Sequence, residues 1–259
     1  MSQLIPISDL NPTRRFAVVT VVLIALNVVA FVQTPQFGLG TRSTVYFFEN
    51  APVPCQLEDS CPNDEILPGL RIPERNFGSF LMSIVVSTFL HGGPIHLAGN
   101  MLFLWVFGNN IEDRLGRVKY ILFYLLGGVA AAFAHIYWTL ARAPEACTNA
   151  DPSACIPAVG ASGAVAAIMG AYILLFPRAR VNVLVAIFVL WTVIQLSAFA
   201  VLGLWFLYQF LIGSQEFSGA TEVAWMAHVG GFVYGVVVMF FLGGRPHKPP
   251  EVWRPEWGY

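Results

Sequence analysis

Long apolar runs without charged residues are the feature that most constrains this chain. Most of these runs have roughly the 17–25 residues that a helix needs to cross a bilayer. The whole chain fits this pattern, because 56% of its 259 residues are hydrophobic and only 11% are charged, against about 25% charged in soluble domains. The sequence therefore predicts a membrane protein built from apolar helices. The runs cover residues 16–33, 94–111, 120–141, 157–176, 181–212 and 223–242.

The fifth run, 181–212, is longer than one crossing requires and allows two readings. It could hold one tilted helix with a lead-in at the membrane interface, or two shorter elements. Ser162 and His228 lie near the start of the runs on either side of it. These two polar residues reach the same side of the membrane only if an odd number of crossings separates them. We therefore expect one crossing at about 192–212, with 181–191 in or near the interface, and an all-α bundle of six transmembrane helices.

The basic residues predict how this bundle lies in the membrane. With the N-terminus inside, ten of the 14 lysines and arginines fall in cytoplasmic segments, as the positive-inside rule requires. Both termini are then cytoplasmic, and 34–93 becomes a long first outer loop whose apolar stretch 80–90 suits the interface. We divide the chain into a cytoplasmic N-terminal tail (1–15), a membrane domain (16–243) and a Pro-rich cytoplasmic tail (244–259). No cleavage site of small residues follows the first run, so we interpret that run as an uncleaved anchor.

All four cysteines fall on the outer side in this topology. An oxidising exterior permits disulfides there, and four cysteines allow three pairings. The simplest pairing closes a short loop within each outer segment, joining Cys55 to Cys61 and Cys147 to Cys155. Pairing between the two segments is the alternative, and it would tie them together above the candidate site.

Four polar side chains come to one depth below the outer surface. His96 and Asn100 lie four residues apart and so share one face of the second predicted helix. Counted from the residue where each helix enters, Asn100, Ser162 and His228 lie about 7 to 9 Å deep at a rise of about 1.5 Å per residue. Polar and ionisable residues are expensive inside a membrane and mark functional sites by default. The shared depth therefore predicts one site that contains all four.

The residue types in this set are those of acyl transfer. A serine hydroxyl is a weak nucleophile that needs a base within hydrogen-bond reach. A neutral histidine can take its proton and return it to the leaving amine. The resulting oxyanion needs preorganised donors, which the Asn100 amide, a His96 ring N–H and the Ser162 backbone N–H could supply. The apolar runs hold no acidic residue near His228, so we expect a Ser162–His228 dyad.

Each of these residues also has a structural interpretation. Serine and glycine are common at helix interfaces in membranes, and a lone histidine or asparagine can join helices by a hydrogen bond. The coincidence of all four at one depth favours the chemical interpretation. We assign other polar residues to structure. His135 is assigned to packing, Trp205 and Gln209 to packing or the membrane interface, and the charged residues Glu112, Asp113, Arg114 and Arg117 to a solvated or self-paired helix end.

Small residues and His91 complete the predicted site. His91 comes just before the second helix, where it either lines the cavity entrance or caps the loop. We expect no cofactor and no metal ion. A nucleic-acid partner is also excluded, because the chain has a net charge of −1 and no basic stretch that would neutralise phosphates. The small residues that would let the fourth and sixth helices approach closely are Gly160, Gly163, Gly170, Gly231 and Gly235.

Together these motifs resemble the rhomboid family of intramembrane serine proteases, over about residues 10–243. The resemblance implies a six-helix core, the Ser162–His228 dyad, an oxyanion hole of His96, Asn100 and the Ser162 backbone, and a water-filled cavity that opens outward. It also implies single-pass transmembrane proteins as substrates, membrane lipids as surroundings, and the inner membrane of a bacterium as the location. The motifs are His91-x4-His96-x3-Asn100, Gly160-x-Ser162-Gly163, Ala227-His228-x2-Gly231-x3-Gly235, and the opening Asn11-Pro12-Thr13-Arg14-Arg15.

Two positions depart from the family pattern. Many members carry a Trp-Arg pair in the first loop, and the stretch 76–90 has none. Many also place an aromatic residue four positions after the serine, to stack on the catalytic histidine, where this chain has Ala166. His228 must then be oriented by other packing.

The alternative function is that of a proteolytically weak or inactive rhomboid-like protein that binds membrane-protein clients. The intact Ser162 and His228 argue against it, since such relatives typically lose one or both. For an active protease, a peptide bond reaches the serine only as extended chain, so we expect cleavage near the outer end of a substrate helix, beside Gly or Pro. The connection 213–220, which contains Gly and Ser, is expected to move and admit the chain.

Overall fold

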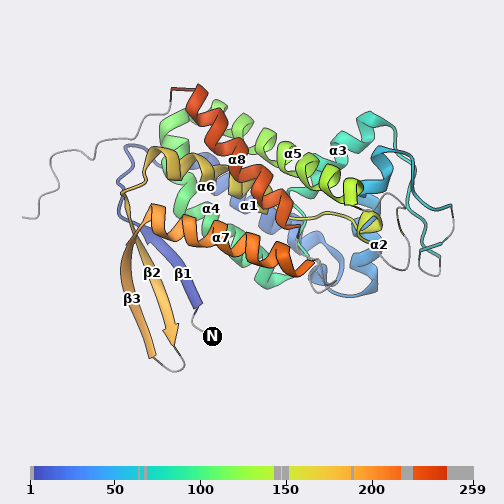
Figure 1. Cartoon of the computed structure of the whole chain (residues 1–259), viewed down its shortest axis with the longest axis horizontal. Helices are drawn as coiled ribbons and strands as arrows, with labels where there is room; N and C mark the ends of the chain where they lie inside the picture. Colours follow the sequence, from blue (N-terminus) through green and yellow to red (C-terminus); the bar gives the residue numbers. More distant parts are fainter. Residues whose placement is uncertain are drawn as a thin grey trace, which may run out of the picture.

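Six helices form a bundle that agrees with the six predicted apolar runs. The computed structural model describes residues 3–63, 65–66, 69–142, 147, 152–187, 190–216 and 224–243. Within this part of the chain, the bundle helices are α1 (Val18–Gln33), α4 (Pro94–Leu115), α5 (Arg117–Arg142), α6 (Ser162–Leu175), α7 (Ala198–Glu216) and α8 (Trp225–Phe241). Almost all side chains of α6 are buried, and the helix packs against α4, α5 and α8 (Figure 1). Each of the six runs therefore contains a helix, with α6 as the central element.

The number of membrane crossings stays a prediction. Among the described residues, α5 is the one helix that is both 18 residues or longer and apolar enough to span a membrane by length and composition. The apolar parts of α1, α6, α7 and α8 are shorter. The predicted C-terminal tail, 244–259, lies outside the described residues, as does the part of the predicted connection 213–220 that follows Glu216.

Close packing between α6 and α8 depends on glycine. A Cβ atom on Gly231 would collide with the carbonyl of Gly163, and one on Gly235 would collide with the carbonyl of Ala167. In the opposite direction, a Cβ on Gly170 would collide with the α8 backbone at Phe232. Small residues let membrane helices approach until their backbones touch. The two helices that carry Ser162 and His228 are thus held at backbone contact.

The predicted first outer loop is folded at one end of the bundle, where α2 (Thr41–Asn50) and α3 (Phe77–Ser87) lie (Figure 1). Arg75 joins these two helices, because its Nη2 donates hydrogen bonds to the carbonyls of Phe48 (3.3 Å) and Glu49 (2.6 Å) in the last turn of α2. Cationic groups stabilise the carbonyl end of a helix. The apolar stretch predicted at 80–90 lies mainly in α3.

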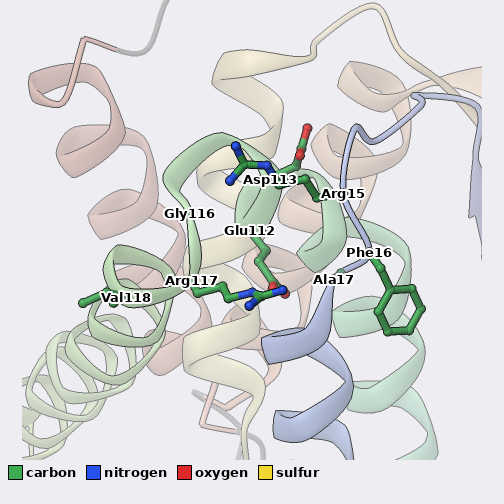
Figure 2. Close-up of a pocket in the computed structure, with 8 residues that line it drawn as sticks. All are labelled: Arg15, Phe16, Ala17, Glu112, Asp113, Gly116, Arg117 and Val118. Atoms are coloured by element: carbon green, nitrogen blue, oxygen red, sulfur yellow. The ribbon is translucent and has the colours of Figure 1, made fainter.

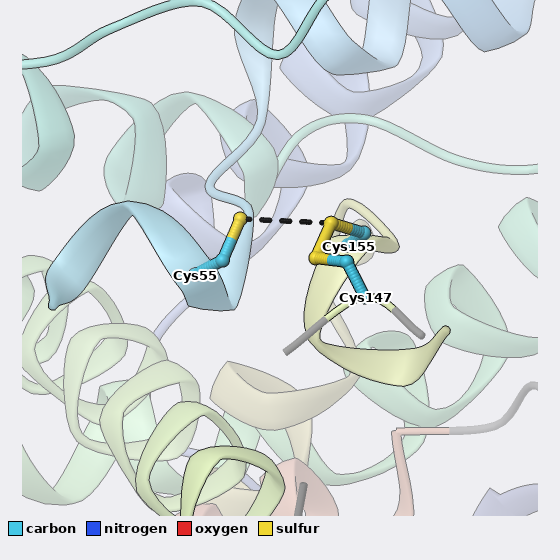
Figure 3. A group of neighbouring side chains, drawn as sticks. All are labelled: Cys55, Cys147 and Cys155. Carbon is cyan, nitrogen blue, oxygen red and sulfur yellow. Dashed lines mark hydrogen bonds between the residues drawn. A yellow bond between two sulfur atoms is a disulfide. The ribbon is translucent and has the colours of Figure 1, made fainter. Parts of the chain in front are cut away.

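Two disulfides fasten this end of the molecule. The bonds join Cys55 to Cys61 and Cys147 to Cys155, so each closes a loop within its own segment. Figure 3 shows Cys55 beside the second disulfide, and its Sγ lies 3.8 Å from the Sγ of Cys155. The two disulfides are therefore in contact, and through them the first outer loop packs against the segment that leads into α6.

A three-stranded antiparallel sheet lies at the opposite end from α2 and α3 (Figure 1). Its strands are β1 (Gln3–Asp9), β2 (Arg180–Ile187) and β3 (Leu190–Ser197), in the order β1-β2-β3. The all-α prediction was wrong here. Residues 181–187 and 190–191 lie in two paired β-strands rather than in an interfacial lead-in, and the fifth helix begins at Ala198 rather than near 192.

The residue types of the hairpin explain the error. Val181, Val183 and Val185 alternate along β2 and are buried on one face of the strand. β-Branched residues favour such a half-buried pleated surface, but within a continuous apolar run they resemble a membrane helix. Residues 3–9, which we assigned to a tail, form β1. This strand pairs with β2, which lies far away in the sequence.

The end of β1 is anchored to the bundle by polar contacts. One Asp9 carboxylate oxygen accepts hydrogen bonds from Tyr172 Oη on α6 (2.5 Å) and from Asn110 Nδ2 on α4 (2.7 Å). Asn11 Nδ2 donates to Asn110 Oδ1 at 2.6 Å. Burial raises the pKa of Asp9 to about 6, although the hydrogen bond from Tyr172 acts in the opposite direction.

Glu112 caps the start of α1. Its carboxylate accepts hydrogen bonds from the backbone N–H groups of Val19 (3.0 Å) and Thr20 (2.7 Å), and from the Thr20 hydroxyl (2.9 Å). The cap residue Ala17 supplies no side-chain bond of its own. The sequence interpretation of Glu112 as part of a solvated or self-paired helix end was therefore wrong, because this side chain is only 4% exposed and its hydrogen-bond donors lie on α1. Figure 2 shows Glu112 in a cavity of about 340 Å³ between Ala17 and Arg117.

Candidate active site

Ser162 is the first residue of α6 and follows a loop that is hydrogen-bonded to the end of α3. Gly160, with φ of +130°, adopts a backbone conformation that favours glycine, and its N–H donates to the carbonyl of Ser87 at 3.0 Å. Residues 157–161 are therefore not helical, and the depth counted along them as helix does not apply. Ser162 stands instead at the N-terminus of α6, where unpaired backbone N–H groups and the helix dipole favour negative charge.

His96 lies over this same loop. A Cβ atom on Gly160 would come within 2.9 Å of the His96 ring and within 3.6 Å of Ser162 Oγ. Only glycine therefore leaves room for the ring beside the serine. The His96 side chain is exposed, so the site has an open side next to Ser162.

His91 orients Asn100. The Asn100 side-chain amide donates to His91 Nε2 at 3.0 Å, and the Nδ1–H of the same ring donates to the carbonyl of Phe89 at 3.3 Å. His91 is fully buried, so it does not line a cavity entrance, and that part of the prediction was wrong. Because an amide nitrogen has two N–H groups, Asn100 keeps a second donor. The rings of His91 and His96 meet edge to face, with centroids 5.1 Å apart.

His228 lies in the first turn of α8 and contacts two residues of α7. Gln209 Oε1 lies 2.6 Å from His228 Nδ1, and the Trp205 ring lies 5.7 Å from the imidazole, centroid to centroid. We had assigned both to packing or the membrane interface. Two features of the sequence could have identified them. Trp205 and Gln209 are four residues apart and so share one helix face, and a glutamine in an apolar helix needs a hydrogen-bond partner.

The structure brings the predicted residues together from four segments. One of the close contacts between α6 and α8, at Gly163 and Gly231, lies beside Ser162 and within one helical turn of His228. His96 and His135 both lie within electrostatic range of His228. His135 Nδ1 is buried without a hydrogen-bond partner among the described residues, so its assignment to packing stands as a prediction.

Two other places with chemistry-bearing side chains lie apart from this group. The sulfurs of Cys55, Cys147 and Cys155 are near enough to share a metal ion, but all are disulfide-bonded, and the thiolate is the form that binds metals. The cavity beside Glu112 lies 12 positions along α4 from Asn100, about 18 Å at the rise of a helix, so it is not part of the site.

The fold and the site define a class of protein: a helical membrane protein with a serine at the start of one helix and a histidine in the first turn of the helix packed against it. The chain belongs to the rhomboid family, because residues 79–245, more than half of the chain, match the Rhomboid domain. Proteins of this family are embedded in membranes.

Individual relatives come from animals, plants and bacteria. The chain is 29% identical over 164 residues to Presenilin-associated rhomboid-like protein A, mitochondrial, of Danio rerio (60% of this chain, 36% of the relative). It is 26% identical over 183 residues to RHOMBOID-like protein 4 of Arabidopsis thaliana (71% and 39%). It is 30% identical over 125 residues to Rhomboid protease AarA of Providencia stuartii (48% and 44%). The matched regions thus span less than half the length of these relatives.

Proposed function

We propose that this protein is an intramembrane serine endopeptidase that cleaves transmembrane segments of membrane-protein substrates with a Ser162–His228 dyad. The observation that carries the proposal is the contact of α6 with α8 at Gly163 and Gly231. This contact supports the proposal, because it fixes the relative position of the two helices that carry Ser162 and His228.

The proposed reaction uses groups that the site already contains. His228 Nε2 takes the proton of the Ser162 hydroxyl as Oγ bonds to the scissile carbonyl carbon, and the carbonyl oxygen becomes an oxyanion. The oxyanion is stabilised by the Ser162 backbone N–H, the free amide N–H of Asn100 and His96. Collapse breaks the C–N bond, and His228 gives its proton to the departing amine. Water then attacks the acyl-serine with His228 again as base.

The proposed substrates are single-pass membrane proteins, and the proposed location is the inner membrane of a bacterium, with both termini cytoplasmic and the site open to the outer face. The arrangement of the molecule supports this orientation. The two disulfides lie at the end with α2 and α3, and oxidised cysteines belong to an oxidising exterior.

Incubation of purified protein with a panel of single-pass substrates in liposomes tests the proposal. We expect wild-type protein to release two fragments from at least one substrate, and Ser162→Ala to release none. Wild-type protein that binds substrates without cutting them would replace the proposal with the client-binding alternative. Equal cleavage by Ser162→Ala, in a preparation free of other proteases, would remove Ser162 from the reaction.

A further inference from the structure

The hydrogen bond between α7 and α8 has a chemical consequence for His228. Gln209 Oε1 is an amide oxygen and can only accept, so at 2.6 Å from Nδ1 it receives the Nδ1–H of the ring. A neutral imidazole carries one ring proton. With that proton on Nδ1, the lone pair is on Nε2, the nitrogen that must accept the proton of a serine.

The same face of α7 also limits how the ring can turn. Trp205, one helical turn before Gln209, lies against the imidazole at 5.7 Å with the ring planes inclined by 50°. Trp205 is itself stacked on Phe232 of α8 at 6.4 Å. Ala166 on α6 is too small to supply an aromatic wall. Both described ring contacts of His228, with Gln209 and Trp205, therefore come from α7.

The Gln209 side chain is buried. Only 4% of it is exposed, and a buried polar group must find a partner to offset the loss of hydration. An amide suits this position, because it fixes the tautomer of the ring without placing a second ionisable group in an apolar bundle, where charge is costly.

We propose that Gln209 is the positioning residue for His228: it holds the imidazole in the tautomer and orientation that can accept the Ser162 proton, with Trp205 as the wall behind the ring. The proposal rests on the proposed function and extends it. The reacting unit then consists of Ser162 on α6, His228 on α8 and Gln209 on α7. Helix α7 must pack against α8 for His228 to have the tautomer and orientation of a base.

The test compares Gln209→Met, which keeps the size of the side chain and removes the acceptor, with Gln209→Glu, which restores an acceptor oxygen. We expect Gln209→Met to lower kcat about 10- to 100-fold, the size of effect seen when a group that orients a metal-binding histidine is removed, with KM for a transmembrane substrate nearly unchanged. Gln209→Glu should recover part of that loss, because its carboxyl oxygen can accept the Nδ1–H although an ionisable group is costly in the apolar bundle. Tyr208→Phe is the matched control, because Tyr208 is the neighbouring polar residue of α7 and is 58% exposed; its kcat should equal that of wild type.

A double-mutant cycle separates positioning from a structural role. Because Gln209 acts through the imidazole, Gln209→Met should have no further effect on the residual rate of His228→Ala, whereas independent effects would add. Thermal unfolding of each variant identifies any that fails to fold, and if Gln209→Met does not fold, Gln209→Leu, which also lacks an acceptor, takes its place in both comparisons. Unchanged kcat in a folded Gln209→Met variant, or a loss that Glu does not recover, overturns the proposal. Absence of cleavage by wild-type protein instead overturns the proposed function.

Discussion

At the scale of single residues, the site combines a helix start, a loop glycine and two histidines with different tasks. His91 accepts a hydrogen bond from Asn100 and is buried, whereas His96 lies over Gly160 next to Ser162. The two rings touch, so the first orients the amide while the second remains open to a substrate. His91 is thus a positioning residue for the proposed oxyanion hole.

Asn100→Ala should reduce kcat by about 10²–10³, the usual effect of losing one oxyanion donor. KM should change little, because the donor acts on the charge that develops during the reaction. His91→Phe removes the acceptor that orients the amide, so it should give a smaller loss in the same direction. Steady-state kinetics on one cleaved substrate measure both. A larger loss for His91→Phe than for Asn100→Ala would contradict this division of tasks.

At the scale of elements, α1 takes its N-terminal cap from α4. Glu112→Ala leaves the N–H groups of Val19 and Thr20 without an acceptor, and we expect it to lower the free energy of unfolding by about 1–3 kcal/mol. Glu112→Gln keeps one acceptor oxygen and should lose less. Asp113→Asn is the control, because this neighbouring carboxylate accepts only a 3.2 Å bond from the Arg14 backbone and is half-exposed. Thermal unfolding in detergent compares the three, and equal effects for Glu112→Ala and Asp113→Asn would contradict the capping role.

The anchor of β1 should depend on pH. Burial raises the pKa of Asp9 to about 6, so the folded protein binds a proton at Asp9 more readily than the unfolded chain does. The stability contributed by that proton is fully present below about pH 4 and is lost as the pH rises through about 6. Asp9→Asn, which stays neutral, should therefore raise the unfolding temperature more at pH 7 than at pH 4.5. Asp59→Asn is the control at an exposed position, and its effect on the unfolding temperature should not differ between the two pH values. An equal shift for Asp9→Asn at both pH values would contradict the prediction.

The helices could be predicted from the sequence, whereas the sheet could not. Charged residues, glycines or prolines bound the apolar runs, so the ends of the helices could be predicted to within several residues. The hairpin of β2 and β3 continues directly into α7 at Ala198, and no change of polarity marks the boundary. Strand β1 depends on pairing with a segment about 180 positions away, a contact that local residue types do not specify.

The chemistry of the site was predictable in part. The types and spacing of His96, Asn100, Ser162 and His228 suggested acyl transfer, because few other interpretations need all four. The partner of His228 was missed, since Gln209 lies on a helix that is apolar on all sides and its direction depends on how α7 packs against α8. The departure at Ala166 indicated that such a partner was needed but not where it would be.

At the scale of the whole molecule, the site lies between a disulfide-fastened end and a sheet-bearing end. A substrate helix hides its carbonyl groups in its own hydrogen bonds, so it must unwind before Ser162 can reach a peptide bond. Replacing Gly or Pro near the outer end of a substrate helix with Leu should therefore slow cleavage several-fold while binding persists. Rates measured in liposomes for the two forms of one substrate test this. Equal rates would mean that unwinding does not limit the reaction.

The most direct measurement is covalent labelling of Ser162 in the intact protein. A serine-directed phosphonate or chloroisocoumarin should attach to wild-type protein, and mass spectrometry of the peptides should place the adduct on Ser162. His228→Ala should lose the labelling although the serine is present, and Ser162→Ala should lose it as well. Labelling of His228→Ala at the wild-type rate, or an adduct on another residue, would contradict the account of Ser162 as a nucleophile activated by His228.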